Sequence, residues 1–242
     1  MRIEADIRAV FFDAGETLVY PHPSFPELFA ETLRARGHAV DPAFVREVVS
    51  VYSQRFSDAA REGSEPTLWS TSREASMRFW LDLYRGFVRE VGIDDGVEEL
   101  AMALYAAFSD LANYRAHPDA IPTLERLART DLTLGLISNF EAWLEQLLEA
   151  VEITRFFPVR VISGVEGIEK PDPRIFEAAL ERAGAIAEQS VYVGDHPFFD
   201  VEAARAVGMH PVLIDRRGRY PDPGCVRITS LEDLPAAIGV DA

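Results

Sequence analysis

Three short apolar runs, each followed by polar residues, constrain most strongly how this chain can fold. They are residues 9–12 before Asp13, residues 132–137 before Ser138 and Asn139, and residues 191–193 before Gly194 and Asp195. Such runs are typical of strands that are buried on both faces of a parallel sheet. Because ligands bind outside the carboxyl ends of parallel strands, we expect these polar side chains to line one crevice. The sequence therefore predicts a single site assembled from distant segments.

Helical and strand patterns alternate from about residue 118 onward. Helices are predicted over 120–129, 141–150, 173–183 and 198–207 with a short one after Leu231, and strands over 132–137, 159–162, 190–193 and 211–214. Strands that alternate with helices of this length imply right-handed crossovers and a parallel sheet. With the strand at 9–12 added, the predicted fold class is α/β, with a doubly wound, Rossmann-like parallel-sheet core.

Between the first strand and the remaining ones, residues from about 24 to 110 read as almost continuous helix. We expect these helices to begin at Ser24, at Asp41-Pro42, at a capping box over Thr71–Glu74 and at Asp95. The block interrupts the sheet pattern, so it is an insertion. We predict an α/β core over 1–20 and 115–242, and an all-helical cap domain over 21–114 that covers the carboxyl ends of the strands.

Composition narrows the class of protein. The 242 residues are 48% hydrophobic and 26% charged, which is ordinary for a globular chain with a full core. The single cysteine, Cys225, excludes an internal disulfide and suits a reducing compartment. No apolar run approaches the ~18 residues needed to span a bilayer, so we predict a cytoplasmic protein without a membrane partner. A net charge of −16 argues against nucleic acid as a binding partner, because nucleic-acid binding needs a basic face. For the same reason, an anionic substrate could bind only beside a local cation.

Four motifs, in this order, resemble those of the haloacid dehalogenase-like hydrolases. They are residues 11–18 (FFDAGETL), residues 137–139 (ISN), residues 170–176 (KPDPRIF), and Gly194-Asp195 with Asp200 ahead of residues 203–208 (AARAVG). The resemblance extends over nearly the whole chain. A helical insertion after the first strand is similar to the cap of one branch of this superfamily, which includes many small-molecule phosphatases and the dehalogenases themselves.

The resemblance implies Mg²⁺-dependent hydrolysis of a small phosphorylated molecule. Asp13 is the candidate nucleophile, since a carboxylate can attack phosphorus and form an aspartyl-phosphate. Asp195 and Asp13 supply hard oxygen ligands that suit Mg²⁺, and the family adds the backbone carbonyl at the position of Gly15. A bound divalent ion would reverse the local field and attract a phosphate despite the acidic chain.

Five further residues complete the predicted site. Lys170 is a point charge that balances Asp13 and a phosphoryl oxygen, on a loop stiffened by the prolines that follow it. Ser138 and Asn139 can donate hydrogen bonds to the same anion, or can act as helix N-caps instead. Asp200 can bind the metal through water, orient Asp195, or cap a helix. Thr17 resembles the family threonine that braces the first loop.

The first motif departs from the family at two positions. Phosphatases of this family carry a second aspartate two residues after the nucleophile, as general acid and base, and this chain has Gly15 there. Glu16 stands where the family has glycine. A positioned acid–base group contributes ~10²–10⁴-fold to turnover, so its loss matters. Glu16, His196 and His22 are the candidate replacements, and each histidine can equally be an ordinary loop residue.

Three functions remain open from the sequence. The first is a Mg²⁺-dependent phosphatase, slow or restricted to good leaving groups. The second is a metal-independent 2-haloacid dehalogenase, because halide leaves without a proton; Asp195, which those enzymes lack, argues against it. The third is a weakened module that binds a phosphate ligand or a protein. Substrate identity and oligomeric state are not predicted.

Overall fold

The computed structural model describes residues 2–62 and 69–240, which divide into two units. The first unit comprises Met1–Val19 and Ala116–Ala242, and the second comprises Tyr20–Arg115. The strands are β1 (Ala9–Phe12), β2 (Val19–Pro21), β3 (Tyr114–Ala116), β4 (Thr133–Ser138), β5 (Val159–Ile162), β6 (Ser190–Gly194), β7 (His210–Ile214) and β8 (Val226–Ile228). The helices are α1 (Phe25–Arg34), α2 (Pro42–Glu62), α3 (Arg73–Glu90), α4 (Val97–Phe108), α5 (Ala120–Leu127), α6 (Leu144–Ala150), α7 (Ser163–Glu166), α8 (Pro173–Ala183), α9 (Ala203–Ala206) and α10 (Leu234–Ala237).

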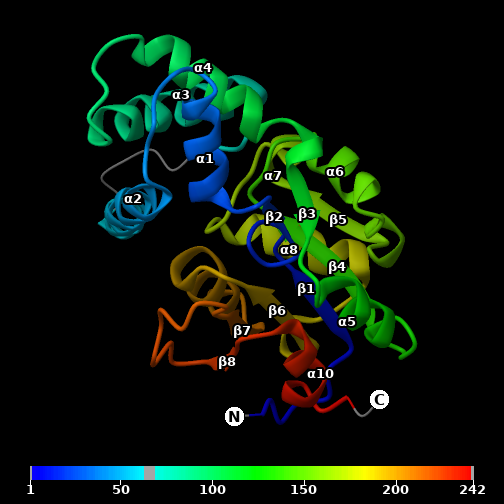
Figure 1. The fold of residues 1–242 in the computed structure, drawn as a ribbon. Coiled ribbons are helices and arrows are strands. Elements are labelled where there is room, and N and C mark those ends of the chain that lie inside the picture. The colour runs from blue at the N-terminus through cyan, green and yellow to red at the C-terminus, as the bar shows by residue number, and fades with distance from the viewer. Residues whose placement is uncertain (1, 63–68, 241–242) are drawn as a thin grey trace. The chain divides into compact units, whose positions relative to one another are not determined.

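A six-stranded parallel sheet forms the centre of the first unit. Its strand order is β5-β4-β1-β6-β7-β8, so β1 lies between β4 and β6 (Figure 1). Phe12 is in register with Leu136 of β4 and with Val193 of β6. These three strands therefore end at one edge of the sheet, and the predicted doubly wound α/β class is confirmed.

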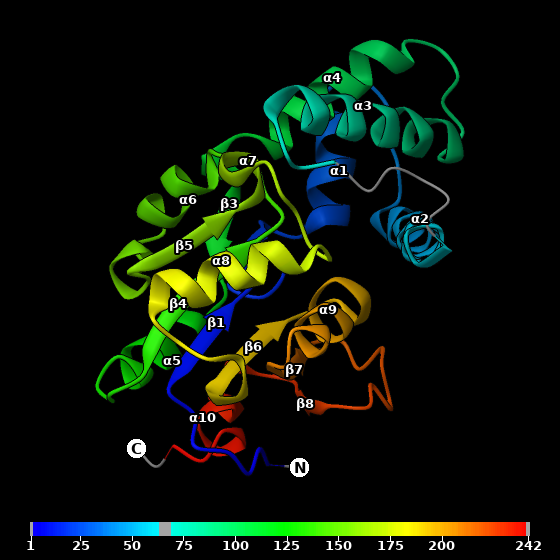
Figure 2. The ribbon, with the colours of Figure 1, turned by 180° about the vertical axis from the view of Figure 1, so that it is seen from behind.

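Helices cover both faces of this sheet. Figure 2 shows α8 crossing in front of β4 and β1, where Phe176 packs with Phe11, Ile137 and Tyr192. On the other face, α5 and α10 contact each other (Figure 1). Alternate residues of each central strand point to opposite faces, and both are covered. This explains why β1 is apolar throughout, as are most strands buried on both faces.

In the described part of the second unit, α1, α2, α3 and α4 pack around an apolar core of their own. Its buried residues include Leu28, Phe29, Leu33, Val45, Tyr84, Phe87, Leu104 and Phe108. The predicted starts at Ser24 and Asp41 are confirmed, since the Asp41 carboxylate accepts the Ala43 amide at 2.9 Å. The predicted position of this unit over the carboxyl ends of the strands stays a prediction. Within the described residues, no helix is long and apolar enough to cross a membrane.

Several predicted boundaries are wrong. The capping box at Thr71 is replaced by Ser72, whose extended backbone places its hydroxyl 3.1 Å from the Ala75 amide. The fourth helix begins after Gly96 rather than at Asp95, because Gly96 adopts the left-handed conformation with φ +67°. The predicted helix over 198–207 is a π-helical turn, η4 (Pro197–Glu202), followed by α9. Strands β2, β3 and β8 were not predicted, since three residues are too few to show periodicity.

Candidate active site

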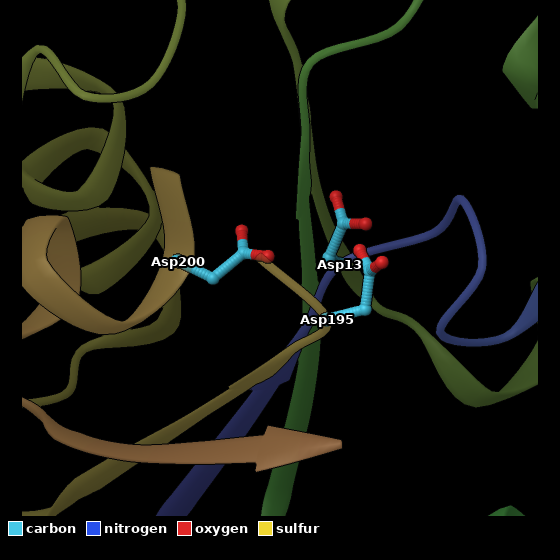
Figure 3. A group of neighbouring side chains, drawn as sticks. All are labelled: Asp13, Asp195 and Asp200. Atoms are coloured by element: carbon cyan, nitrogen blue, oxygen red, sulfur yellow. The ribbon is translucent and has the colours of Figure 1, made fainter. Parts of the chain in front are cut away.

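The parallel strands bring the predicted polar residues to one edge of the sheet. Asp13 follows β1, and its amide donates to the Val193 carbonyl of β6 at 2.8 Å. Ser138 is the last residue of β4, and Asp195 follows the last residue of β6. The carboxylates of Asp13, Asp195 and Asp200 turn toward one another, each with an oxygen within 4.8 Å of the others (Figure 3).

A buried ammonium group organises these carboxylates. Lys170 Nζ donates to Asp13 Oδ1 at 2.8 Å, to Asp200 Oδ1 at 2.6 Å and to the Tyr192 hydroxyl at 2.8 Å. An ammonium has three hydrogens, so all its donors are used. Burial alone would lower the pKa of Lys170, but Asp13 and Asp200 outweigh it and raise that pKa to about 12. Lys170 is therefore a fixed positive charge rather than a proton carrier.

Asn139 holds the backbone of Lys170 in place. Its Oδ1 accepts the Lys170 amide at 2.6 Å, and its Nδ2 donates to the Lys170 carbonyl at 2.8 Å. This pair of bonds links the end of β4 to the loop before α8. The contacts favour a supporting role for Asn139 over direct donation to an anion, because its amide is already engaged.

Ser138 contacts the candidate nucleophile directly. Its Oγ lies 3.0 Å from Asp13 Oδ1, the oxygen that also accepts from Lys170. Among the described residues, no hydrogen bond reaches the second oxygen of Asp13. Burial raises the pKa of Asp13, while the ion pair with Lys170 and the hydrogen bond from Ser138 oppose that rise. One carboxylate oxygen is thus anchored and the other is free to react or to bind a metal.

Asp200 is a buried anchor, and Gly194 makes room for it. Its Oδ1 accepts from Lys170, and its Oδ2 accepts the His196 amide at 2.8 Å. A Cβ at Gly194 would overlap the Asp200 carboxyl group, so only glycine fits there. The π-helical turn carries Asp200 into this position, as such turns often do at functional sites. Both oxygens are committed, which favours an orienting role over direct metal ligation.

His196 acts as the N-cap of that turn. Its Nδ1 accepts the amides of Phe198 and Phe199 at 3.2 and 3.3 Å. A ring nitrogen held in this way satisfies helix donors and is not available to a substrate. A role for His196 in proton transfer would depend on its other nitrogen. His22 belongs to the second unit, and its predicted role stays a prediction.

The site has a surplus of negative charge that fits a divalent cation. Burial, then Asp200 and Asp13, raise the pKa of Asp195 well above its ordinary value. Its ion pair is with Arg219 at 3.6 Å, too long for a strong hydrogen bond. Free oxygens on Asp13 and Asp195 are the hard ligands that Mg²⁺ prefers. These residues therefore suit a metal.

The loop after Asp13 is held by an arginine. Arg216 donates to the Thr17 carbonyl at 2.8 Å and more weakly to the Glu16 carbonyl at 3.3 Å. Its guanidinium is itself fixed by Asp119 at 2.7 and 2.9 Å. Thr17 is fully buried, its hydroxyl has no partner among the described residues, and its carbonyl accepts from Arg216, so the predicted bracing role of its side chain stays a prediction.

Glu16 adopts a backbone conformation that favours glycine. Its φ is +55°, a value uncommon for side chains other than asparagine and aspartate. Its carboxylate lies 3.4 Å from Arg217, and burial raises its pKa while nearby arginines oppose the rise. Gly15 has an ordinary φ, and a Cβ there would meet no atom within 4 Å. Its carbonyl as a metal ligand stays a prediction.

Sequence reasoning missed three participants. They are Tyr192, which links Lys170 to the Ile137 carbonyl, the Arg216–Asp119 pair, and Arg219 beside Asp195. A tyrosine inside an apolar strand was a usable signal, since a buried hydroxyl needs a partner. A stronger signal for the site is that Lys170 is the one lysine in the sequence, among 24 basic residues.

Comparison with known proteins agrees with this geometry. A family model described as haloacid dehalogenase-like hydrolase matches residues 7–208. The chain belongs to the haloacid dehalogenase-like hydrolase family. The resemblance inferred from the four motifs is thereby confirmed, and the chain is a hydrolase by family.

Curated relatives match over most of their length. Haloacid dehalogenase-like hydrolase domain-containing protein 3 of Xenopus laevis is 32% identical over 86% of this chain and 84% of its own. Glyceraldehyde 3-phosphate phosphatase of Methanopyrus kandleri is 32% identical over 89% of this chain and 87% of its own.

Solved structures share the fold. A magnesium-bound HAD-hydrolase of Bacillus subtilis, YfnB, has a TM-score of 0.76 at 17% identity, covering 97% of this chain and 99% of its own. A dehalogenase with an intermediate complex has a TM-score of 0.69 at 21% identity, covering 99% of this chain and 100% of its own. The chain therefore shares its fold with a magnesium-bound hydrolase and with a dehalogenase.

The charge of Lys170 can be measured in isolation, because the sequence has no other lysine. We expect lysine-specific isotope labelling to give one side-chain signal, which titrates near 12 rather than at the ordinary 10.5. Because the folded state raises this pKa, the charge of Lys170 stabilises the folded protein below pH 10.5, and this stabilisation is lost as the pH rises from 10.5 through 12. Asp200→Asn removes one partner and should lower this pKa. The urea-unfolded chain is the control, and titration of the folded protein at or below 10.5 would contradict the ion-pair geometry.

Proposed function

We propose that this hydrolase is a Mg²⁺-dependent phosphatase that acts on a small phosphomonoester through an aspartyl-phosphate at Asp13. One observation carries the proposal. The Asp13 carboxylate is anchored by Lys170 and Ser138 through one oxygen, while the Asp195 carboxylate, whose side chain is 23% exposed, stands beside it with Arg219 no closer than 3.6 Å. A nucleophile next to uncompensated negative charge is the arrangement that a metal-assisted phosphoryl transfer needs. Phosphatases among the relatives support the same class of reaction.

The side chains divide the reaction into two steps. In the first, a carboxylate oxygen of Asp13 attacks phosphorus and the ester P–O bond breaks; an aryl oxygen leaves as the anion, and an alkyl oxygen takes its proton from water. In the second, water attacks phosphorus, inorganic phosphate is released and the Asp13 carboxylate is restored. Lys170 and Ser138 hold the Asp13 carboxylate in position for attack. The positive charge of Lys170 also stabilises the negative charge that develops on the phosphoryl oxygens.

Asp13, Asp195 and the Gly15 carbonyl would hold the metal. When bound, Mg²⁺ neutralises charge on the carboxylates and on the phosphoryl group. Asp200 contributes by keeping Lys170 and the His196 amide in place. The same residues argue against a metal-independent dehalogenase, which has no use for an aspartate at position 195.

The absence of an acidic side chain at position 15 favours substrates with good leaving groups. Gly15 has no proton to give, and the Glu16 carboxylate is paired with Arg217 at 3.4 Å. Burial raises the pKa of Glu16, which favours the protonated form that a donor needs, and Arg217 opposes this rise for as long as it stays beside the carboxylate. Glu16 is thus the candidate replacement, and aryl phosphates, whose leaving groups need no proton, are the substrates of choice for assay.

Magnesium dependence is tested by turnover and by thermal stability. We expect hydrolysis of p-nitrophenyl phosphate that is abolished by chelation, no halide release from 2-chloropropionate, and a Tm increase of about 5 °C at saturating Mg²⁺. The increase should be smaller near pH 5 than near pH 7.5. The folded state raises the pKa values of Asp13 and Asp195, so the free energy of unfolding falls as the pH rises and both carboxylates ionise. A bound Mg²⁺ offsets the repulsion between the ionised carboxylates, so it stabilises the protein more at the higher pH.

Asp195→Asn should remove both the Mg²⁺-dependent turnover and the Mg²⁺-induced rise in Tm. The control is Asp131→Asn, at an exposed aspartate before β4, which should leave turnover and the rise in Tm intact. Halide release from 2-chloropropionate without a metal would contradict the proposal and show that the protein is a 2-haloacid dehalogenase. A Mg²⁺-induced stabilisation that survives Asp195→Asn would exclude the shared metal site.

The missing acid is tested by restoring it. Gly15→Asp should raise turnover of ethyl phosphate by up to about 10²-fold, with little change on p-nitrophenyl phosphate, because only the alkoxide needs a proton. The position tolerates a side chain, since its φ is ordinary and no atom lies within 4 Å of a Cβ. Gly15→Asn is the matched control, of the same size but unable to transfer the proton.

Glu16→Gln distinguishes the two explanations of the departure. If Gly15→Asp gives no gain on ethyl phosphate and Glu16→Gln abolishes the existing activity, Glu16 already transfers the proton. That result would contradict the expectation that the acid is missing.

A further inference from the structure

A turn rich in arginine follows β7 beside the candidate active site. It comprises residues 215–220, here called the arginine turn, and it places Arg216, Arg217 and Arg219 within four positions of a chain whose net charge is −16. Because β7 is parallel to β6, the arginine turn leaves the sheet at the same edge as Asp195. Positive charge is therefore concentrated where an acidic protein must receive an anionic substrate.

The arginine turn is rigidly built. The buried Asp215 carboxylate accepts the amides of Arg219 and Tyr220, both at 2.9 Å. Arg216 ties the turn to the nucleophile loop and is neutralised by Asp119. The backbone that carries the other two arginines is thus held in place without their side chains.

Arg217 and Arg219 remain available at the site. Their side chains are 48% and 45% exposed, compared with 20% for the anchored Arg216. Arg217 lies 3.4 Å from the Glu16 carboxylate and Arg219 lies 3.6 Å from Asp195. Contacts of this length between exposed groups are weak and are exchanged readily for a better anion.

The charges of the site show what these arginines add. Asp13, Asp195, Asp200 and Glu16 are four carboxylates, and Lys170 is the buried cation among them. A divalent metal and Lys170 leave these four carboxylates with one net negative charge, and the two arginines turn this into one net positive charge, so the arginines make this edge of the site attractive to an anion. Lys170 and the metal already face the phosphoryl group, which leaves the arginines for another anionic group. The guanidinium forks also match carboxylate and phosphate groups, which bind them through two parallel hydrogen bonds.

We propose that Arg217 and Arg219 bind a second anionic group of the substrate. The substrate class is then a phosphomonoester that also carries a carboxylate or a second phosphate. This inference rests on the proposed phosphatase function, because it assigns the substrate of that same site.

Three esters with a common three-carbon chain test the assignment. The neutral reference is 3-hydroxypropyl phosphate, and the anionic probes are 3-(phosphonooxy)propanoate and propane-1,3-diyl bisphosphate. We expect kcat/KM for at least one anionic probe to exceed that for the reference by about tenfold, and the better probe distinguishes carboxylate from phosphate. The preference should shrink at about 0.5 M salt, since exposed charges are screened.

Arg217→Gln with Arg219→Gln should lower the ratio of kcat/KM for the preferred probe to kcat/KM for the neutral reference about tenfold, and this ratio cancels any effect on Glu16 or Asp195 that all three esters share. Arg182→Gln is the matched control, an arginine paired with Glu166 on α7. An equal loss on all three esters, or no preference in the wild type, would overturn the proposal.

Binding separates this inference from the proposed function. In an Asp13→Asn protein, calorimetry with the same three esters should show the same preference and its loss in the arginine variants. If the wild type hydrolyses neither p-nitrophenyl phosphate nor any of the three esters but this binding preference persists, the phosphatase function fails while the anion site stands. If the wild type turns over the reference without any preference, the anion site fails alone.

Discussion

The buried ion pair between Lys170 and two aspartates is the interaction on which the site depends. Lys170 is 3% exposed and uses its three hydrogens on Asp13, Asp200 and Tyr192. Removing one partner from such a pair typically costs about 3–5 kcal/mol, since it leaves an uncompensated buried charge. The ends of β1 and β6, together with the π-helical turn, are therefore held in one arrangement by a single ammonium. In a chain that otherwise uses arginine for every basic residue, this position has the compact cation that fits between two carboxylates.

Much of the sheet and of the residue set at its edge could be predicted from the sequence. Apolar runs such as residues 9–12 are fully buried in the structure, and their ends coincide because β1, β4 and β6 are parallel and in register. Strand-end placement alone brings Asp13, Ser138 and Asp195 together, whatever their separation along the chain. The assignment of a family from four ordered motifs was equally available.

Contacts made by single atoms were not predictable. Nothing in the residues around Asn139 indicates that its amide holds the Lys170 backbone, or that Arg216 fastens the nucleophile loop through Asp119. These contacts join segments whose relative positions depend on the completed sheet. The turn that carries Asp200 was predicted as a regular helix, because π-helical geometry leaves no periodic signal in six residues. The left-handed backbone at Glu16 also contradicts local preference, as functional sites often do.

The central claim is that Asp13 becomes covalently phosphorylated, and it can be tested directly by trapping. Wild-type protein is mixed with p-nitrophenyl phosphate and Mg²⁺, quenched within the first turnover, and reduced with borohydride, which converts an acyl phosphate into the alcohol. The aspartyl-phosphate mechanism predicts that tandem mass spectrometry finds homoserine at position 13, and finds none at position 195 or in unreacted protein. Steady turnover with an unmodified Asp13 throughout the time course would contradict it.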